Sequence, residues 1–287
     1  MIPPAFDYHA PRSVAEAVAL LGSLGPEAKL LAGGHSLLPM MKLRFALPTH
    51  LIDLNRIDAL RGVRDDGDTV RIGAMTVESD LIASPVLRAR VPLLVEAARM
   101  IADPQVRNRG TIGGDIAHGD PANDHPALSL ALDATFVLTG PGGERTVAAD
   151  DFFLGTYMTA LAEDEIMTEI RVPAFAPGTG WSYHKLKRKT GDWATAGAAV
   201  VLRVAGGRVS HARIGLTNLG PTALRAADAE AALIGRALDD ASIDAAARAA
   251  MAICDPADDL RGDAEYKTAM AGHMVRRAIR AAAARAH

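Results

Sequence analysis

Two glycine-rich segments, far apart in the sequence, contain the residues best suited to holding a ligand. The first is Ala32-Gly33-Gly34-His35-Ser36, and the second is Gly110-Thr111-Ile112-Gly113-Gly114-Asp115. Paired glycines let a backbone approach a ligand closely, and they leave N–H groups free to meet phosphate oxygens. Two such segments in one fold indicate a long ligand that is held at several points, such as a dinucleotide.

The first segment follows a predicted strand and enters a predicted helical turn. This arrangement presents backbone N–H groups and the Ser36 hydroxyl to an anion. The segment matches neither Gly-x-Gly-x-x-Gly nor the Gly-Lys-Ser/Thr of a P-loop. On the pattern alone, a tight turn without a ligand therefore remains an open alternative, and His35 fits a structural histidine as well as a ligand contact.

The second segment opens the densest polar stretch of the chain, residues 107–126. Asp115 and Asp124 cannot lie directly on a phosphate, because like charges repel. Hydroxyl groups of a ribose or ribityl chain are the partners that suit these carboxylates. Arg107 and Arg109 fit either a phosphate or an exposed loop, and the sequence leaves both alternatives open.

A metal site is the competing interpretation of the same stretch. Side chains of the types that ligate metals are His118, Asp120, Asp124 and His125. Their spacing, His-x-Asp-x₃-Asp-His, does not match the His-x-His-x-Asp-His pattern of metallo-β-lactamase-like hydrolases, and the chain has no His-Glu-x-x-His motif. We therefore rank a metal-dependent hydrolase below a nucleotide-binding protein.

The elements that would position these residues alternate between helices and short strands. Periodicity and capping signals predict helices from Val14 to about Gly25 and over residues 76–82, 92–101 and 127–132. Short strands are predicted over residues 29–32, 51–54, 70–74, 134–138 and 165–172, with a hairpin turn at Gly67-Asp68.

Residues 173–178 are the best linker candidate, and the pattern changes after them. Three antiparallel strands are predicted over residues 183–187, 198–204 and 209–216, followed by helices from about Thr222, Ser242 and Ala264. The expected fold class is α+β. We expect a two-lobed domain over residues 1–176, with lobes of about 1–56 and 57–176. A smaller domain of a three-stranded antiparallel sheet plus helices is expected over residues 177–287.

Composition narrows the function classes. A net charge of −3 and 4% aromatic residues give no reason to expect nucleic-acid binding. The single cysteine, Cys254, can form no internal disulfide and cannot hold an iron–sulfur cluster, which needs about four ligands. The sequence shows neither a signal-peptide pattern nor a stretch apolar enough to span a bilayer, so we expect a cytoplasmic chain without a transmembrane segment.

Four motifs together resemble one family. They are AGGHSLLPMMK at residues 32–42, TIGGDIAH at 111–118, KRKTGDWA at 187–194 and DLRGDAEYK at 259–267. The chain resembles the medium, FAD-binding subunit of molybdenum hydroxylases, especially of the aerobic carbon monoxide dehydrogenase type. The resemblance covers essentially the whole chain, in order and without large gaps.

The resemblance implies an FAD-binding domain of the vanillyl-alcohol oxidase type, followed by a carboxy-terminal domain particular to these subunits. It places the FAD pyrophosphate against residues 32–36 and 111–115. It also implies cofactor contacts at Ile101, Asp124, Leu161 and Lys187, and it puts Trp193 beside the isoalloxazine ring, with a core or interface aromatic as the alternative.

The resemblance also implies a relay of three subunits. A large subunit would oxidise the substrate at a molybdenum cofactor, a small subunit would carry two [2Fe–2S] clusters, and this chain would carry FAD with no catalytic residue of its own. We expect a dimer of such heterotrimers, which could bring the chain to the inner face of a membrane. Carbon monoxide is the leading substrate of the complex. The alternatives are an N-heterocycle, a purine or an aldehyde, a stand-alone flavin oxidoreductase, or a scaffold protein without FAD.

Overall fold

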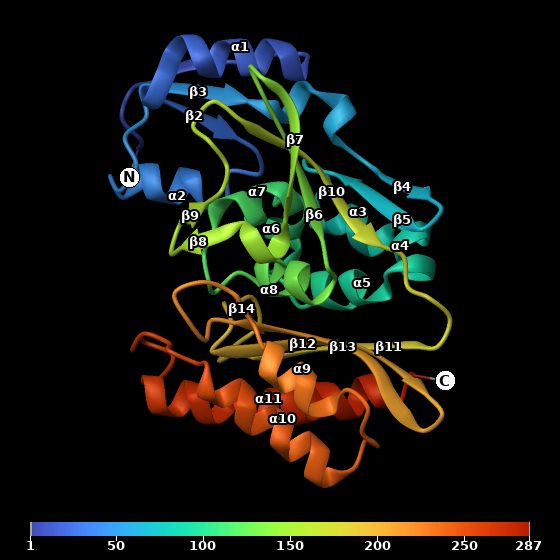
Figure 1. Cartoon of the computed structure of the whole chain (residues 1–287). Coiled ribbons are helices and arrows are strands. Elements are labelled where there is room, and N and C mark those ends of the chain that lie inside the picture. The colour runs from blue at the N-terminus through green and yellow to red at the C-terminus, as the bar shows by residue number, and fades with distance from the viewer. Residues whose placement is uncertain (1, 287) are drawn as a thin grey trace.

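The computed structural model describes residues 2–286, and its elements lie in three tiers (Figure 1). A small parallel sheet lies at one end, a five-stranded sheet with helices lies in the middle, and a four-stranded sheet with helices lies at the other end. This mixture of helices with mainly antiparallel sheets is the α+β class that the sequence predicts.

The first tier is a parallel sheet in the order β1-β3-β2. Its elements are β1 (Asp7–His9), α1 (Val14–Leu24), β2 (Ala28–Leu31), α2 (Leu37–Lys42) and β3 (His50–Asp53). Helix α1 begins where the sequence predicts, because the Ser13 hydroxyl accepts a hydrogen bond from the Glu16 N–H at 3.1 Å. The Glu16 carboxylate in turn accepts a hydrogen bond from the Arg12 N–H at 2.8 Å. Helix α1 packs on β2 and β3.

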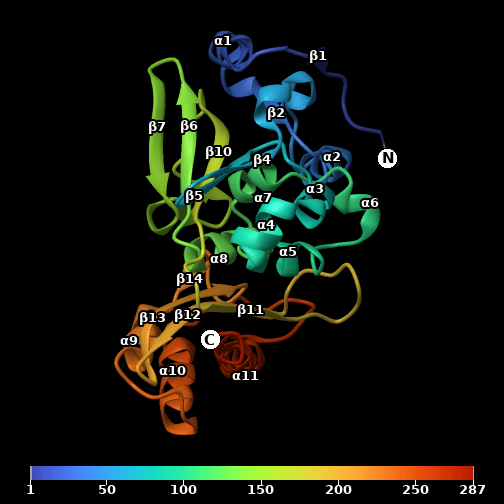
Figure 2. The ribbon, with the colours of Figure 1, turned by 90° about the vertical axis from the view of Figure 1, so that its right-hand side faces the viewer.

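The middle tier is an antiparallel sheet in the order β4-β5-β10-β6-β7. Its strands are β4 (Val63–Asp66), β5 (Thr69–Gly73), β6 (Thr135–Gly140), β7 (Gly143–Ala148) and β10 (Ile166–Pro173), and a small hairpin adds β8 (Phe153–Gly155) and β9 (Met158–Thr159). Its helices are α3 (Glu78–Ala83), α4 (Pro85–Arg90), α5 (Pro92–Ala98), α6 (Pro104–Arg107), α7 (Ile112–His118) and α8 (Asp124–Ala131). Figure 2 shows helices α3 to α7 on one side of β6, β7 and β10.

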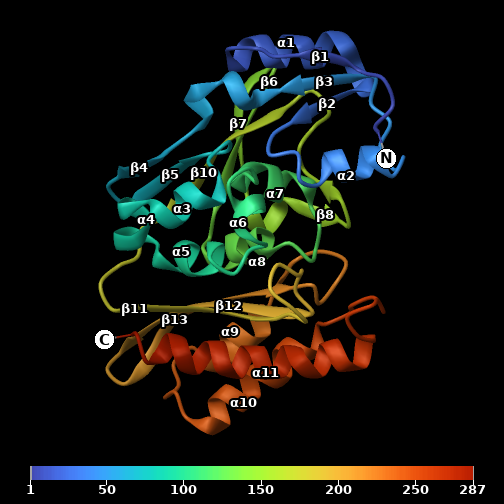
Figure 3. The same cartoon turned by 180° about the vertical axis from the view of Figure 1, so that it is seen from behind.

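The third tier is an antiparallel sheet in the order β11-β12-β13-β14. Its elements are β11 (Thr179–Leu186), β12 (Ala196–Ala205), β13 (Arg208–Thr217), β14 (Leu224–Arg225), α9 (Ala227–Leu233), α10 (Asp240–Ala252) and α11 (Ala264–Ala283). Helices α5 and α8 lie against one face of this sheet, and α11 lies against the other (Figure 3). The sheet is therefore covered on both faces, which explains why residues 196–202 of β12 are all buried.

Several predicted elements differ from the observed ones. The small sheet has four strands rather than three, because Leu224 and Arg225 pair with β13. For the same reason α9 begins at Ala227 and not near Thr222. Strand β2 is only half-buried, with Ala28 alone enclosed, and α5 ends at Ala98 rather than Ile101.

Among residues 2–286, none of the helices combines the length and apolarity that crossing a bilayer requires.

Candidate functional site

The first glycine segment connects β2 to α2 and carries a row of unused backbone donors. Gly34 has φ +79°, a left-handed conformation that glycine adopts without strain. The N–H groups of Gly33, Gly34, His35 and Ser36 donate to no acceptor among the described residues. Successive free N–H groups around a left-handed residue form a concave site for an anion.

The second segment forms the start of helix α7 (Ile112–His118). Thr111 caps α7, and its Oγ1 accepts the Gly114 N–H at 3.2 Å. The N–H groups of Ile112 and Gly113 donate to the carbonyls of Thr76 and Ala74. These two donors are therefore already used within the chain. The glycines of this segment matter mainly because they let other atoms come close to its backbone.

The fold brings the two glycine segments into contact. A Cβ atom on Gly33 would lie 2.5 Å from the Arg109 carbonyl oxygen and 2.8 Å from the Cα of Gly110. A Cβ atom on Gly114 would lie 3.3 Å from the Cβ of Ala32. The absence of side chains at these positions is thus what allows the segments to meet, and one ligand can touch both.

Asp115 is the acidic residue of the second segment, and it faces a buried polar cluster. The cluster includes His125, whose Nε2 lies 2.8 Å from Oε1 of Glu78. Three side-chain atoms in it are buried without a hydrogen-bond partner among the described residues: Asp115 Oδ2, Glu78 Oε2 and His125 Nδ1. Burial, helped by the nearby carboxylates, raises the pKa of Asp115 to about 7 although His125 opposes the shift. Burial opposes protonation of His125, but Glu78 raises its pKa to about 9.

Asp124 lies in the same region and is almost fully enclosed. Its Oδ2 accepts a hydrogen bond from Lys185 Nζ at 2.7 Å, and the Tyr183 hydroxyl donates to its Oδ1. The Lys185 side chain is 2% exposed and that of Asp124 is 5% exposed. Both Asp124 oxygens therefore have partners from β11, and the expected contact between Asp124 and the cofactor stays a prediction.

The structure also places three further predicted contact residues. Lys187 Nζ donates to the Met100 carbonyl at 3.1 Å, so Lys187 lies beside Ile101. Leu161 follows β9. The same stretch of chain reaches the carboxy-terminal end of α7, where the Tyr157 N–H donates to the Gly119 carbonyl. Leu161 packs against the hydrophobic cluster that includes Ile112 of the second glycine segment.

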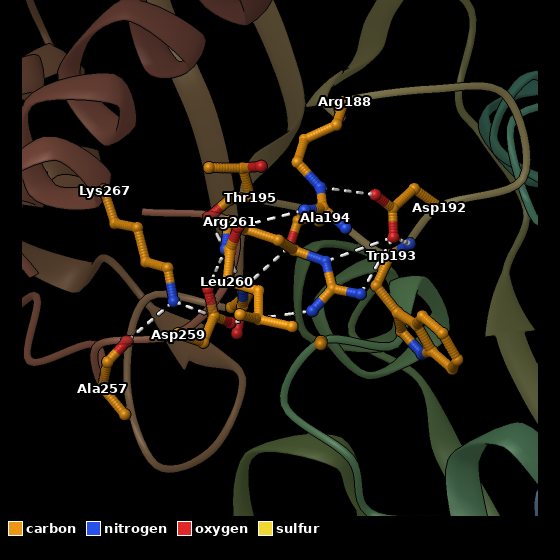
Figure 4. A network of polar contacts seen from close by, with 12 residues as sticks. Arg188, Asp192, Trp193, Ala194, Thr195, Ala257, Asp259, Leu260, Arg261 and Lys267 are labelled. Atoms are coloured by element: carbon orange, nitrogen blue, oxygen red, sulfur yellow. Dashed lines mark hydrogen bonds and ion pairs between the residues drawn. The ribbon is translucent and has the colours of Figure 1, made fainter. Parts of the chain in front are cut away.

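Trp193 is half-exposed, at 51%, on the loop between β11 and β12. The guanidinium carbon of Arg261 lies 5.4 Å from the centre of its ring. Figure 4 shows this indole beside Arg261 and Asp192. An exposed indole held by one face is available to a second planar group, as the predicted stacking requires.

The metal alternative meets no support in the described residues 2–286, where no group of three or more His, Cys, Asp or Glu side chains is placed to hold a metal ion. Asp120, Asp124 and His125 each have a separate partner instead: the Ala122 N–H, Lys185 and Glu78.

Sequence reasoning missed Glu78, Tyr183, Lys185 and Arg261. Along a strand every second side chain shares a face, so Tyr183 and Lys185 belong to one face of β11, and Lys187 directly follows the last residue of that strand. This alternation along the strand could have indicated Lys185 and Tyr183.

Arg261 lies in the motif at residues 259–267, but no local pattern indicates that it reaches Trp193. Arg107 is now placed, because it donates to the carbonyls of Ile101 and Ala102.

The site fits FAD because its free backbone N–H groups can donate hydrogen bonds to a pyrophosphate. A pyrophosphate needs several hydrogen-bond donors from a backbone that carries no bulky side chains. Residues 33–36 supply free N–H groups, and the missing side chains of Gly33 and Gly114 let the two segments lie close together.

Comparisons with known proteins support the same conclusion. Residues 4–175 match the family model described as the FAD binding domain in molybdopterin dehydrogenase, and residues 181–282 match the CO dehydrogenase flavoprotein C-terminal domain. The chain is 72% identical to the carbon monoxide dehydrogenase medium chain of Hydrogenophaga pseudoflava, over 99% of both chains. It is 39% identical to the nicotine 6-hydroxylase medium subunit of Paenarthrobacter nicotinovorans, over 98% of this chain and 99% of that one.

Solved structures agree in fold. A chain of carbon monoxide dehydrogenase from Hydrogenophaga pseudoflava, 74% identical, superposes with a TM-score of 0.99 over the full length of both chains. A chain of quinoline 2-oxidoreductase from Pseudomonas putida 86, 33% identical, superposes with a TM-score of 0.93 over 99% of both. The chain therefore belongs to the family of FAD-binding medium subunits of the molybdopterin dehydrogenases, which are oxidoreductases.

Proposed function

We propose that this chain is the electron-transfer subunit of a carbon monoxide dehydrogenase and that it holds FAD where its two glycine segments meet. The observation that carries the proposal is the row of free N–H groups at residues 33–36, on a segment that meets the second one where Gly33 lies against Gly110 and Ala32 lies against Gly114. The pyrophosphate would lie along residues 32–36 and 111–115. Further contacts would come from Ile101, Asp124, Leu161, Lys187 and Trp193.

When bound, FAD supplies the ability to exchange electrons one or two at a time. The residues of this chain bind and orient the cofactor and set the polarity around it. The electrons would come from the [2Fe–2S] clusters of a small partner subunit and would leave to an external acceptor. No side chain of this chain need touch the substrate, which a large molybdenum-containing subunit would oxidise.

Carbon monoxide is the proposed substrate because the identity to a carbon monoxide dehydrogenase medium chain is 72% over nearly the whole length. The identity to a nicotine 6-hydroxylase medium subunit, at 39%, keeps an N-heterocycle as the alternative. We further propose two domains, at residues 1–176 and 177–287, and a cytoplasmic dimer of heterotrimers that contacts the inner face of the membrane through the complex.

The test is to purify the complex with its large and small partner chains and to measure its FAD content. Carbon monoxide, nicotine and a purine are then added separately without oxygen, and the visible absorption of the flavin is followed. We expect rapid bleaching with carbon monoxide only. Bleaching with nicotine or the purine alone would mean that the substrate of the complex is a heterocycle and not carbon monoxide. A complex without FAD would contradict the proposed function itself.

A further inference from the structure

The loop that carries Trp193 is held by a charged segment from the carboxy-terminal part of the chain. Asp192 precedes Trp193, and its side chain is 4% exposed. Arg261 Nη2 donates to Asp192 Oδ1 at 2.9 Å, and Arg188 Nε donates to Oδ2 at 3.0 Å. Burial alone would raise the pKa of Asp192, but the hydrogen bonds from Arg261 and Arg188 lower it to about 2.

Arg261 therefore contacts two neighbouring residues of the loop in different ways. Its guanidinium is hydrogen-bonded to Asp192 through two nitrogens, Nε and Nη2, and its carbon lies 5.4 Å from the ring centre of Trp193. The planar guanidinium suits both contacts at once, because it can offer two donors in its plane and its face to an aromatic ring.

The segment that presents Arg261 is itself anchored in the core of the third tier (Figure 4). Lys267, on α11, has a side chain that is only 1% exposed. Its Nζ lies 2.9 Å from Asp259 Oδ2 and donates to the Ala257 carbonyl at 2.7 Å. Arg188 Nη1 donates to the Leu260 carbonyl at 3.0 Å, which ties the segment to the loop a second time.

The other side of the loop lies against the middle tier. Lys187 Nζ donates to the Met100 carbonyl, and a Cβ atom on Gly191 would lie 3.7 Å from the carbonyl carbon of Ala102. The loop thus spans from the residues around Ile101 to the Arg261 segment, with the indole of Trp193 exposed between its two anchors.

We propose that Arg261 is the positioning residue for Trp193 and that it fixes the indole in the orientation that receives the isoalloxazine ring. This inference rests on the proposed function, and it names the residue that sets the contact between Trp193 and the flavin. With Arg261 on one face of the indole, the opposite face is the one left for the flavin. The carboxy-terminal segment would therefore control the cofactor site of the rest of the chain.

The chain offers a matched control in its second tryptophan. The guanidinium carbon of Arg285 lies 5.2 Å from the ring centre of Trp181. The first experiment labels the full chain with 5-fluorotryptophan and records its ¹⁹F NMR spectrum, which has one signal for each indole. Arg261→Gln should shift and narrow the Trp193 signal and raise its exposure to a soluble paramagnetic probe. Arg285→Gln should change the Trp181 signal only. An unchanged Trp193 signal in Arg261→Gln would overturn the proposal.

The second experiment measures FAD binding by the complex assembled with its partner chains. Arg261→Gln should weaken binding about two- to fivefold, the scale of an exposed cation–π contact. Arg261→Lys keeps the charge without the planar fork, so it should recover part of the loss, and Arg285→Gln should bind as the wild type does. Release of Trp193 with unchanged FAD affinity would overturn the link to the cofactor. A wild-type complex that binds no FAD would contradict the proposed function, while the NMR experiment would still decide the role of Arg261 in holding the loop.

Discussion

Gly33 shows at the scale of one residue how leaving out a side chain lets two segments of the backbone meet. Its Cβ position is occupied by backbone atoms of Arg109 and Gly110, which cannot move aside as a flexible side chain can. An alanine there must push the two glycine segments apart. The free N–H groups of residues 33–36 would then move away from the second segment.

We therefore expect Gly33→Ala to destabilise the chain by about 1–3 kcal/mol, as overpacking does. We also expect it to lower FAD affinity by tenfold or more, since about 1.4 kcal/mol corresponds to a factor of ten. Urea unfolding of the chain and FAD titration of the assembled complex measure the two effects.

The control for this change is Gly22→Ala. Gly22 lies in α1 with nothing near its Cβ position, so alanine should stabilise the helix by up to about 1 kcal/mol. FAD affinity should not change. Equal FAD binding by Gly33→Ala and the wild type would contradict the assignment of the first glycine segment.

Asp115 carries a second prediction, because its pKa is raised from 3.8 to about 7. Between these values the folded chain holds a proton that the unfolded chain has released. Stability from this group is therefore complete in acid and is lost as the pH rises toward 7. Asp115→Asn removes this titration, so the variant should gain stability relative to the wild type as the pH rises.

The measurement is urea unfolding of both chains without cofactor at about pH 5 and about pH 8. The difference between variant and wild type should favour the variant more at the higher pH. Asp164→Asn makes the same replacement at an exposed position and is the control for the substitution itself. In the wild type, His125 adds a further decline of stability between pH 6.5 and about pH 9. Asp115 contributes to the raised pKa of His125, so the variant should decline less in this range, in the same direction as the predicted difference. An equal difference at both pH values would show that Asp115 does not titrate in this range.

At the scale of elements, one buried ion pair joins α8 to β11. Lys185 and Asp124 are both nearly inaccessible, and the Tyr183 hydroxyl completes the arrangement. Removing one partner leaves the other buried without a countercharge, which typically costs about 3–5 kcal/mol. We expect this loss for Lys185→Met.

The double variant Asp124→Asn/Lys185→Met removes both charges and should recover part of that loss. Urea unfolding of the chain without cofactor measures the free energy of unfolding of the wild type, the single variant and the double variant. Arg280→Gln breaks the exposed pair with Asp240 and should cost no more than about 1 kcal/mol. A Lys185→Met chain as stable as Arg280→Gln would mean that the buried pair does not hold the two elements together.

The elements also show what local sequence patterns can predict. The start of α1 was predictable because Ser13 and Glu16 act within one turn, and the hairpin at Gly67-Asp68 was predictable because its turn residues are adjacent. Strand β14 was not, because Leu224 and Arg225 form a strand only by pairing with β13. The same holds for the site: the glycine segments are visible in the sequence, but the contact of Gly33 with Arg109 and that of Arg261 with Trp193 are made by the tertiary fold.

At the scale of the whole molecule, the third tier does more than extend the chain. Its sheet is covered by α5 and α8 on one face and by α11 on the other. It supplies Lys185 from β11, Lys187 from the loop that follows β11, and Arg261 from the loop between α10 and α11. The residues around the proposed cofactor site thus come from both halves of the chain, so we expect the cofactor to bind only where both halves are folded together.

The central claim is that FAD binds where the two glycine segments meet, and a structure of the assembled, FAD-loaded complex tests it most directly. We predict that the pyrophosphate oxygens lie within hydrogen-bond distance of the backbone N–H groups of residues 33–36, with the other side of the pyrophosphate against residues 111–115. A structure in which the pyrophosphate lies elsewhere, with these N–H groups bound to water or to a partner chain, would contradict the claim.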